Sequence, residues 1–157
     1  MSGLIERINL YPEAWEAVKV DPQRLAAGAT TETIRLQTPI AHMRRTATRD
    51  VEFGGKSIRK GDKVVLWYNS GNRDETVFPD GDRWDPAREN SRRHLSFGYG
   101  IHRCLGARLA ELQLTTLISE MAKRGMDVKL VGEPERLPSC FTSGFEHMTV
   151  TMSRRHD

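Results

Sequence analysis

The sequence predicts a mainly α-helical protein with small β-sheets, and three observations support this fold class. Helix-forming sequence fills the N-terminal quarter, where Pro12, Pro22 and Pro39 divide it into separate segments. Short runs rich in β-branched and aromatic residues, separated by glycine turns, follow over 46–68. A second long helical pattern covers 105–124, and short strand-like runs resume after it. The sequence pattern therefore predicts helices accompanied by β-hairpins.

We expect three helices before Pro39. The first two span 4–10 and 12–20, and each ends where a proline follows. The third begins at Thr30 or Thr31, because a threonine hydroxyl can cap the first free backbone N–H groups of a helix. It is closed by Pro39, which has no N–H with which to continue it.

Strands and an irregular segment occupy the middle of the chain. A strand over 46–53 leads into Gly54-Gly55, a dipeptide typical of a two-residue hairpin turn. A second strand covers 63–68, where Val, Leu and aromatic residues gather. The following segment, 69–96, is long and irregular, with glycines and prolines spread along it.

The C-terminal third begins with a long helix over 105–124, which Gly125 can terminate. We expect this helix to be mostly buried, because its polar residues fall on one line and the others are largely apolar. That line consists of Arg108, Glu111, Thr115 and Ser119. Beyond Gly125, two short strands flank 134–138, and a final strand pair is expected near 139–141 and 145–151.

Composition limits the possible functions. The 157 residues are enough for one domain with a hydrophobic core, and 24 basic and 21 acidic side chains give a net charge of +3. No long basic run is present, so we expect no nucleic-acid partner. With only Cys104 and Cys140, the sequence argues against a disulfide scaffold. No apolar run approaches the ~18 residues that a membrane-spanning helix needs, so we expect no membrane span and a cytoplasmic location.

The segment 97–106, Phe-Gly-Tyr-Gly-Ile-His-Arg-Cys-Leu-Gly, is the most informative part of the chain. It places Cys104 after a glycine-studded loop and just before the predicted helix. A helix N-terminus stabilises the negative charge of a thiolate, so this cysteine is suited to be a single-thiolate metal ligand. No second cysteine lies nearby in the sequence, which argues against zinc. The alternative is a buried structural thiol, because free cysteines are often core residues.

Two further motifs lie outside this loop. Glu32 and Arg35 are three positions apart on a helix, so their side chains can pair, although taken alone this is an ordinary surface ion pair. The stretch 83–88, Arg-Trp-Asp-Pro-Ala-Arg, is rich in turn formers and supplies Arg88. Between these two motifs, 71–74 form a Gly-Asn-Arg-Asp turn.

Together these motifs resemble those of the cytochrome P-450 monooxygenases, whose haem-ligand loop has the pattern aromatic-x-x-Gly-x-x-x-Cys-x-Gly. The chain matches this pattern at Phe97, Gly100, Cys104 and Gly106, and its other motifs occur in the family's order. The resemblance implies the mainly α cytochrome P-450 fold with haem b (iron protoporphyrin IX) as cofactor. It also implies that Cys104 binds the iron as a thiolate, a ligand that donates electron density strongly.

The same resemblance implies roles for further residues. A polar cluster that braces the coil before the cysteine loop would consist of Glu32, Arg35 and Arg88. Haem contacts besides Cys104 would come from Phe97, Gly98, Gly100, His102, Gly106 and Arg45. Arg44 competes with Arg45 for a haem propionate, and a solvated strand-edge charge is the other interpretation of Arg45. The substrate channel would be lined by Ile40, Ala41, Met43 and Phe141, for which core packing is an equally good explanation.

The runs 37–47, 61–74 and 132–136 resemble the bacterial branch that hydroxylates terminal carbons of alkanes and fatty acids. We therefore expect a haem-thiolate monooxygenase that uses O2 to hydroxylate an alkyl substrate such as a medium-chain alkane or fatty acid. Electrons would come from an iron–sulfur ferredoxin with its NAD(P)H-dependent reductase. A basic surface could steer the ferredoxin, although the same charges also serve solubility. It would consist of Arg92, Arg93, Arg103 and Arg108.

Members of this family are much longer than the present chain. We therefore expect residues 1–157 to be the C-terminal haem-binding portion of a single cytochrome P-450 domain. The resemblance places no oxygen-activating catalytic residue within them. One alternative is a haem-binding or structural fragment without independent catalysis, and another is a basic protein with an inert core cysteine.

Overall fold

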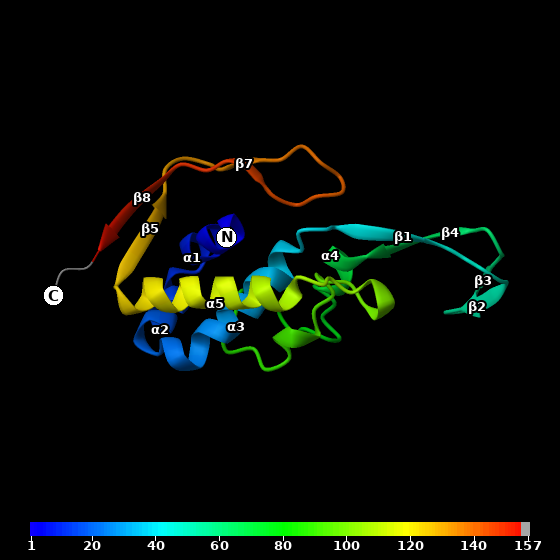
Figure 1. Cartoon of the computed structure of the whole chain (residues 1–157), viewed down its shortest axis with the longest axis horizontal. Coiled ribbons are helices and arrows are strands. Elements are labelled where there is room, and N and C mark those ends of the chain that lie inside the picture. Colours follow the sequence, from blue (N-terminus) through cyan, green and yellow to red (C-terminus); the bar gives the residue numbers. More distant parts are fainter. Residues whose placement is uncertain (155–157) are drawn as a thin grey trace.

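The computed structural model describes residues 1–154, in which helices pack together and four two-stranded antiparallel sheets lie around them (Figure 1). The helices are α1 (Ser2–Leu10), α2 (Pro12–Val20), α3 (Pro22–Gln37), α4 (Tyr68–Gly71) and α5 (Ala107–Lys123), with 3₁₀ turns η1 (Ser91–Arg93) and η2 (Gly100–His102). The strands are β1 (His42–Thr46), β2 (Val51–Phe53), β3 (Lys56–Ile58), β4 (Lys63–Trp67), β5 (Met126–Leu130), β6 (Glu135–Arg136), β7 (Phe145–His147) and β8 (Val150–Arg154). The predicted fold class, mainly α with small sheets, is confirmed. Among the described residues, no helix is both long and apolar enough to cross a membrane.

The hydrophobic core lies where α3 packs on α5, with α1 and α2 contributing from the other side. Leu4, Val18 and Ile118 are fully buried there, and Trp84 joins them from the irregular segment. Burial of a side chain of this size stabilises the fold by roughly 1.5–3 kcal/mol. The first two helices follow the prediction closely, because Pro12 and Pro22 stand in the first turns of α2 and α3.

The third helix is much longer than predicted at its N-terminal side. Asp21 is its actual cap, and its carboxylate accepts a hydrogen bond from the Arg24 N–H (3.1 Å). The prediction that Thr30 or Thr31 caps the helix is therefore wrong. Both lie within α3, where the Thr30 hydroxyl donates to the Ala26 carbonyl four residues earlier (2.9 Å). A threonine that binds its own helix in this way does not end it.

The prediction that the long helix is mostly buried is also wrong for its N-terminal half. Leu109 and Leu112 are exposed, and so is Leu105 just before α5, whereas the buried side of α5 carries Leu114 and Ile118. The four polar residues expected to lie on one line of this helix do not all face solvent, since the Thr115 hydroxyl lies 2.9 Å from that of Thr30 on α3. Gly125 ends the helix as expected, with a φ of 58° and its N–H bonded to the Ala122 carbonyl (3.0 Å).

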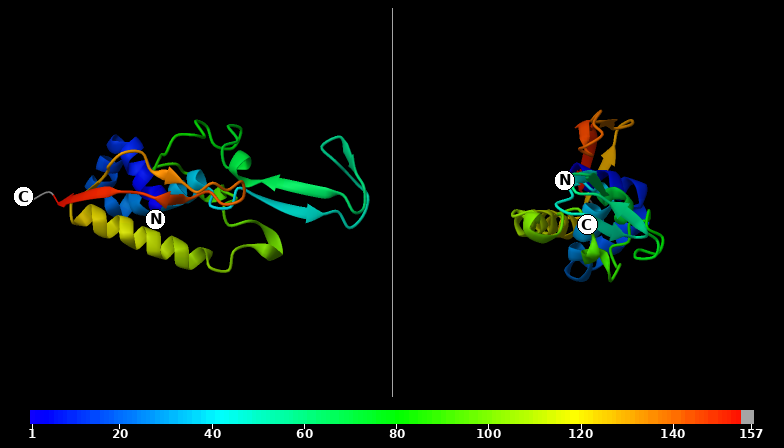
Figure 2. Two further views of the ribbon diagram at one scale, coloured as in Figure 1. Left: turned by 90° about the horizontal axis from the view of Figure 1, so that it is seen from above. Right: turned by 90° about the vertical axis from the view of Figure 1, so that its right-hand side faces the viewer.

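The β1–β4 ladder, with β2 and β3 at its tip, extends away from the helical body, whereas β5 and β8 lie along the helices, where β5 contacts α1 (Figure 2). The single strand expected over 46–53 is divided between two strands. β1 ends at Thr46 and pairs with β4, whereas β2 pairs with β3. Gly54 and Gly55 both have positive φ, which a type I′ hairpin turn requires. In the C-terminal part, β5 pairs with β8 and β6 with β7. The strand expected at 139–141 is absent among the described residues, where Thr142 forms only an isolated bridge with Ile40.

The irregular segment is held by a buried ion cluster. Arg35 donates from Nε and Nη2 to the two carboxylate oxygens of Glu32 (2.6 and 2.9 Å), and both side chains are fully buried. Arg88 Nε lies 3.2 Å from the same carboxylate, and the Asp85 N–H donates to it (3.1 Å). Arg35 also donates to the carbonyls of Asn72 and Gly81 (2.6 Å each) and Arg83 (3.1 Å). One side chain of α3 thus fixes three points of the segment 69–96.

We predict that Arg35→Lys lowers the free energy of unfolding by about 3 kcal/mol, because lysine keeps the charge but leaves buried oxygens without their planar donor. Urea unfolding followed by tryptophan fluorescence measures this loss, because Trp15 and Trp84 are both buried. The matched control is Arg24→Lys, which changes an exposed arginine paired with Asp21 and should cost less than about 0.5 kcal/mol. Equal losses for both variants would contradict the bracing role of Arg35.

Candidate functional site

An apolar cavity of about 340 Å³ lies between the cysteine loop and the segment that follows α3. Its lining residues are Pro39, Ile40, Met43, Arg45, Tyr68, Ser96, Phe97, Gly98, His102 and Cys104. Seven of these are residues that the sequence singled out for the haem or the substrate: Ile40, Met43, Arg45, Phe97, Gly98, His102 and Cys104. They come from separate parts of the chain, and the fold brings them together around one cavity.

The cysteine loop is shaped by glycines and closed by a backbone hydrogen bond. Gly98 and Gly100 have φ values of 70° and 75°, a conformation that side chains other than glycine rarely adopt. The Cys104 N–H donates to the Phe97 carbonyl (2.8 Å), which holds the two ends of the loop together. An added Cβ at Gly106 would lie 4.0 Å from Cys104 Sγ, so the sulfur sits close to the start of α5. Cys104 itself is exposed.

Two buried side chains tie the start of this loop to the end of α3. Asn72 Oδ1 accepts a hydrogen bond from the Leu95 N–H (2.6 Å), and its Nδ2 lies 2.9 Å from the hydroxyls of Thr38 and Ser96. The Ser96 hydroxyl in turn donates to the Ile34 carbonyl (2.7 Å). The position of the loop is therefore set by the same helix that carries the buried ion cluster.

Strand β1 separates the two candidate arginines. Arg45 lines the cavity, whereas Arg44 is exposed and does not line it. Consecutive residues of a strand point to opposite faces, which explains why only one of the pair can face the cysteine loop. On the other side of the cavity, η2 supplies His102. The geometry thus favours Arg45 over Arg44 as the cation beside the cavity.

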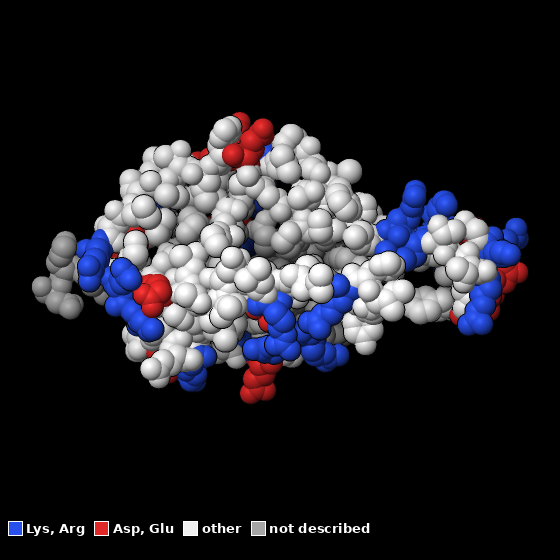
Figure 3. All heavy atoms as spheres, in the orientation of Figure 1, with Lys and Arg blue, Asp and Glu red and all other residues white. Residues whose placement is uncertain are grey.

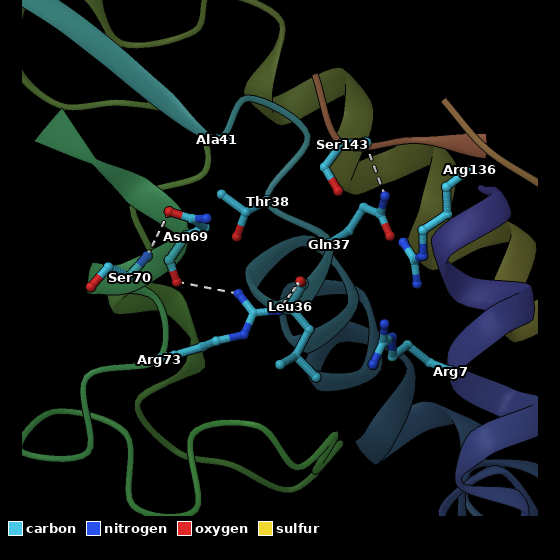
Figure 4. A pocket seen from close by; sticks show the side chains of 10 residues that line it. All are labelled: Arg7, Leu36, Gln37, Thr38, Ala41, Asn69, Ser70, Arg73, Arg136 and Ser143. Carbon is cyan, nitrogen blue, oxygen red and sulfur yellow. Dashed lines mark hydrogen bonds between the residues drawn. The ribbon is translucent and has the colours of Figure 1, made fainter. Parts of the chain in front are cut away.

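Four of the eleven residues predicted to contact haem or substrate do not line this cavity. Gly100 and Gly106 shape the loop, and Phe141 packs edge-on against the ring of His42 (5.7 Å between centroids). Ala41 lines a second cavity, of about 320 Å³, on the other side of the same segment (Figure 4).

The second cavity contains three arginines, but their guanidinium groups have partners within the fold. Arg7 and Arg136 both contact the buried Glu6 carboxylate. Arg73 donates to the carbonyls of Leu36 (2.8 Å) and Asn69 (3.2 Å) (Figure 4). These contacts join α1, α3, α4 and β6, so we assign the arginines to the packing of the elements.

Sequence reasoning missed Tyr68 and Ser96 as lining residues. Tyr68 is buried at the start of α4, and its hydroxyl oxygen would lie only 3.5 Å from a Cβ added at Gly98. Tyr68 directly follows β4 in the chain. It reaches the cavity because the pairing of β4 with β1 places this end of β4 next to the cysteine loop. No local pattern signals this, since the position depends on the pairing of two strands that are distant in sequence.

The residues around the larger cavity suit a haem group. A thiol is a soft ligand for iron, and Cys104 supplies it at the cavity wall. For the two carboxylates of a porphyrin, Arg45 can supply a positive charge with bidentate donors and His102 can supply an N–H donor. Ile40, Met43 and other apolar side chains provide the remaining contact. The set of donors therefore fits haem, with one thiol for the iron and two N–H donors, Arg45 and His102, for its carboxylates.

His94 supports the cysteine loop from behind. Its ring lies 5.4 Å from that of Phe97, and its Nδ1 accepts a hydrogen bond from the Ser96 N–H (3.2 Å). Desolvation by burial, together with the positive charges of Arg103 and Arg35, lowers the pKa of His94 from 6.5 to about 4. The imidazole is therefore neutral at neutral pH, as its acceptor role requires.

We predict that this histidine makes stability depend on pH between about 4 and 6.5. The unfolded chain binds a proton there that the folded chain does not, so stability is complete above pH 6.5 and falls as the pH drops toward 4. Partial solvent contact limits the loss to about 2 kcal/mol. Urea unfolding across this pH range should show that His94→Gln flattens the profile, whereas His147→Gln, at an exposed histidine, does not. A steep profile retained in His94→Gln would disprove the assignment.

Comparisons with known proteins agree with this geometry. The family model for cytochrome P-450 matches residues 25–124. The structure superposes on CYP153D17 from Sphingomonas sp. with a TM-score of 0.94 and 51% identity, covering 98% of this chain and 38% of that one. For cytochrome P-450-153 from Novosphingobium aromaticivorans the TM-score is 0.93 and the identity 50%, with coverage of 98% and 38%.

Curated relatives give the same result. Linalool 8-monooxygenase of Pseudomonas putida is 42% identical over 152 residues, which is 97% of this chain and 37% of the relative. A methyl-branched lipid omega-hydroxylase of Mycobacterium tuberculosis is 42% identical over 147 residues, 93% of this chain and 34% of the relative. The chain thus spans little more than a third of the proteins that it matches. On the strength of the family match and of the shared fold, the chain belongs to the cytochrome P-450 family.

Proposed function

We propose that this chain is the C-terminal haem-binding portion of a monooxygenase that hydroxylates an alkyl substrate, such as a medium-chain alkane or fatty acid. The observation that carries this proposal is the position of Cys104 at the wall of an apolar cavity, with Arg45 and His102 lining the same space. In the proposed reaction, one atom of O2 enters a C–H bond and the other leaves as water. Two electrons and two protons complete the balance.

The names of the relatives support an apolar substrate. They describe a linalool monooxygenase, an omega-hydroxylase of a methyl-branched lipid and a C26-monooxygenase of a steroid. An alkyl chain is compatible with the apolar side chains of Ile40 and Met43 at the cavity. Terminal hydroxylation of an alkane or fatty acid is the specific activity that we propose within this range.

Each residue of the site has a distinct part in the proposed mechanism. Haem, when bound, supplies the activation of molecular oxygen. Cys104 would bind its iron as a thiolate, and the positive φ of Gly98 and Gly100 would let the backbone approach the group closely. Phe97 lines the same cavity, and its carbonyl accepts the Cys104 N–H, so its ring would contribute apolar contact to the bound group. Arg45 and His102 would bind the carboxylates of the cofactor and so would fix its orientation.

The exposed apolar side of α5 supports the proposal that the chain is one portion of a larger domain. Leu105, Leu109 and Leu112 form a stripe that no described residue covers. Contiguous exposed leucines of this kind mark a surface that packs against another part of a fold. The second candidate function is therefore a haem-binding or structural portion without independent catalysis, and the stripe is the observation that favours it.

Electron delivery requires a partner, and we propose an iron–sulfur ferredoxin with its NAD(P)H-dependent reductase. The side chains of Arg92, Arg93, Arg103 and Arg108 are exposed around the cysteine loop and the start of α5. None of the four forms an ion pair within the described part of the chain. A basic surface with free charges attracts an acidic protein over long range.

We predict that the haem-loaded chain, reduced and treated with carbon monoxide, shows the Soret band whose wavelength gives the family its name. Cys104→Ala should abolish this band, because the thiolate ligand is lost. Cys140→Ala is the matched control and should retain it, since Cys140 is an exposed cysteine away from the cavity. A band that survives in Cys104→Ala would refute thiolate ligation by this residue. A flat spectrum in the unmodified chain would favour the structural alternative.

We also predict that Arg108→Glu slows reduction by ferredoxin by about tenfold at low ionic strength and weakens its dependence on salt. Stopped-flow reduction of the haem-loaded chain measures both effects. Lys129→Glu introduces the same charge change on an exposed position of β5 and should leave the rate unchanged. Unaltered kinetics in Arg108→Glu would show that this arginine takes no part in steering.

A further inference from the structure

We propose that His94 is a positioning residue for the thiolate ligand, acting through Phe97 on the backbone that carries Cys104. This role rests on the proposed function, in which Cys104 is the residue that would bind the haem iron. His94 does not line the cavity, whereas Phe97 and Cys104 both do. The influence of His94 on a bound group therefore passes through its neighbours in the cysteine loop.

The cysteine loop begins with a turn over 95–98, and both ends of this turn are fixed by hydrogen bonds. The Gly98 N–H donates to the Leu95 carbonyl and closes the turn (2.8 Å). The Leu95 N–H donates to the side chain of Asn72, which is fully buried (2.6 Å). These bonds leave the Ser96 N–H, at the centre of the turn, in need of an acceptor of its own.

His94 supplies the contacts at the centre of the turn. Its Nδ1 accepts the hydrogen bond of the Ser96 N–H (3.2 Å). Its ring lies 5.4 Å from the ring of Phe97, with the two planes tilted by 57°, an arrangement that favours contact between aromatic rings. The carbonyl of Phe97 in turn accepts the Cys104 N–H (2.8 Å). One side chain therefore fixes the amide before Phe97 and the ring of Phe97, and Phe97 fixes the amide of the cysteine.

The imidazole of His94 can accept a hydrogen bond only in its neutral form. Burial, together with the positive charges of Arg103 and Arg35, lowers the pKa of His94 from 6.5 to about 4. Arg103 directly precedes Cys104, so the cysteine loop itself favours the form of His94 that can accept. The hydrogen bond from Ser96 is therefore present at neutral pH.

Two substitutions separate the hydrogen bond of His94 from its ring contact. His94→Phe keeps an aromatic ring beside Phe97 but removes the acceptor. His94→Asn removes the ring but keeps an acceptor for a backbone N–H two residues later, a bond for which asparagine is well suited. Asp85 already makes this bond with the Ala87 N–H (2.9 Å). Both substitutions exchange one uncharged side chain for another, so the distribution of Lys, Arg, Asp and Glu side chains in Figure 3 is unchanged.

The first measurement is amide hydrogen exchange of the haem-free chain, resolved by NMR. His94→Phe should speed exchange of the Cys104 N–H by about tenfold, because one lost hydrogen bond shifts a local opening by roughly that factor. His94→Asn should keep the rate within about threefold of the original, since the acceptor is retained. The Gly125 N–H, bonded at the far end of α5, should exchange at its original rate in both variants.

The second measurement is the carbon monoxide spectrum of the reduced, haem-loaded chain. His94→Phe should lower the ratio of the thiolate band to the band of haem without a thiolate ligand by about tenfold. His94→Asn should retain most of the thiolate band.

A control variant with a similar loss of stability is Thr30→Ala, which removes the contact between the hydroxyls of Thr30 and Thr115 (2.9 Å). This contact joins α3 to α5 away from the turn over 95–98. Thr30→Ala should change neither the exchange of the Cys104 N–H nor the ratio of the two bands, because a merely structural loss does not act on the cysteine.

Three results would overturn the proposal. The first is an unchanged Cys104 exchange rate and an unchanged band ratio in His94→Phe. The second is an equal effect in Thr30→Ala, which would show that any loss of stability suffices. The third is a His94→Asn variant as impaired as His94→Phe, because the acceptor would then have no role. An original chain that forms no thiolate band would instead contradict the proposed function, while exchange of the Cys104 N–H would still decide whether His94 positions this residue.

Discussion

The buried ion cluster of Glu32, Arg35 and Arg88 is the interaction on which the arrangement of the site depends. A carboxylate with no solvent contact is costly unless its charge and its lone pairs are matched, and here two arginines and a backbone N–H match them. Because Arg35 uses its remaining donors on three carbonyls of the coil, it fixes a segment that has little regular structure of its own. Because the cluster is desolvated, removal of any one partner leaves a buried charge or carbonyl without a hydrogen-bonding partner, which destabilises the fold.

Asn72 and Ser96 connect the helix that carries this cluster to the cysteine loop. Asn72 contacts the end of α3 and the backbone of Leu95, and Ser96 binds the Ile34 carbonyl, so the loop begins from a fixed point. The glycines then turn the chain, and the bond from the Cys104 N–H to the Phe97 carbonyl closes it. The exposed sulfur is therefore held by a chain of buried contacts that starts at α3. A mobile loop would have to be ordered each time a ligand bound, at a cost in conformational entropy.

The sequence predicts the fold class, the first two helices, the hairpin turn at Gly54-Gly55 and the end of the long helix, because each depends on nearby residues. Local patterns fail where a partner distant in the chain decides the result. Thr30 has the chemistry of a cap, yet tertiary contact with α5 keeps it inside a helix. The leucines of α5 have the pattern of a buried face, yet the described residues cover only the other side. For the site, spacing identifies Cys104 and its loop, but only the β1–β4 pairing reveals Tyr68.

Strand β1 forms one side of the cavity, and the alternation of its side chains gives its two faces different surroundings. Met43 and Arg45 line the cavity, while Arg44 between them is exposed. The strand thus brings one apolar and one charged side chain to the same space, as a ligand with an apolar body and anionic groups requires. Because β4 pairs with β1, the same ladder places Tyr68 beside the cysteine loop. The pairing of these two strands is therefore the contact that turns motifs distant in the sequence into one site.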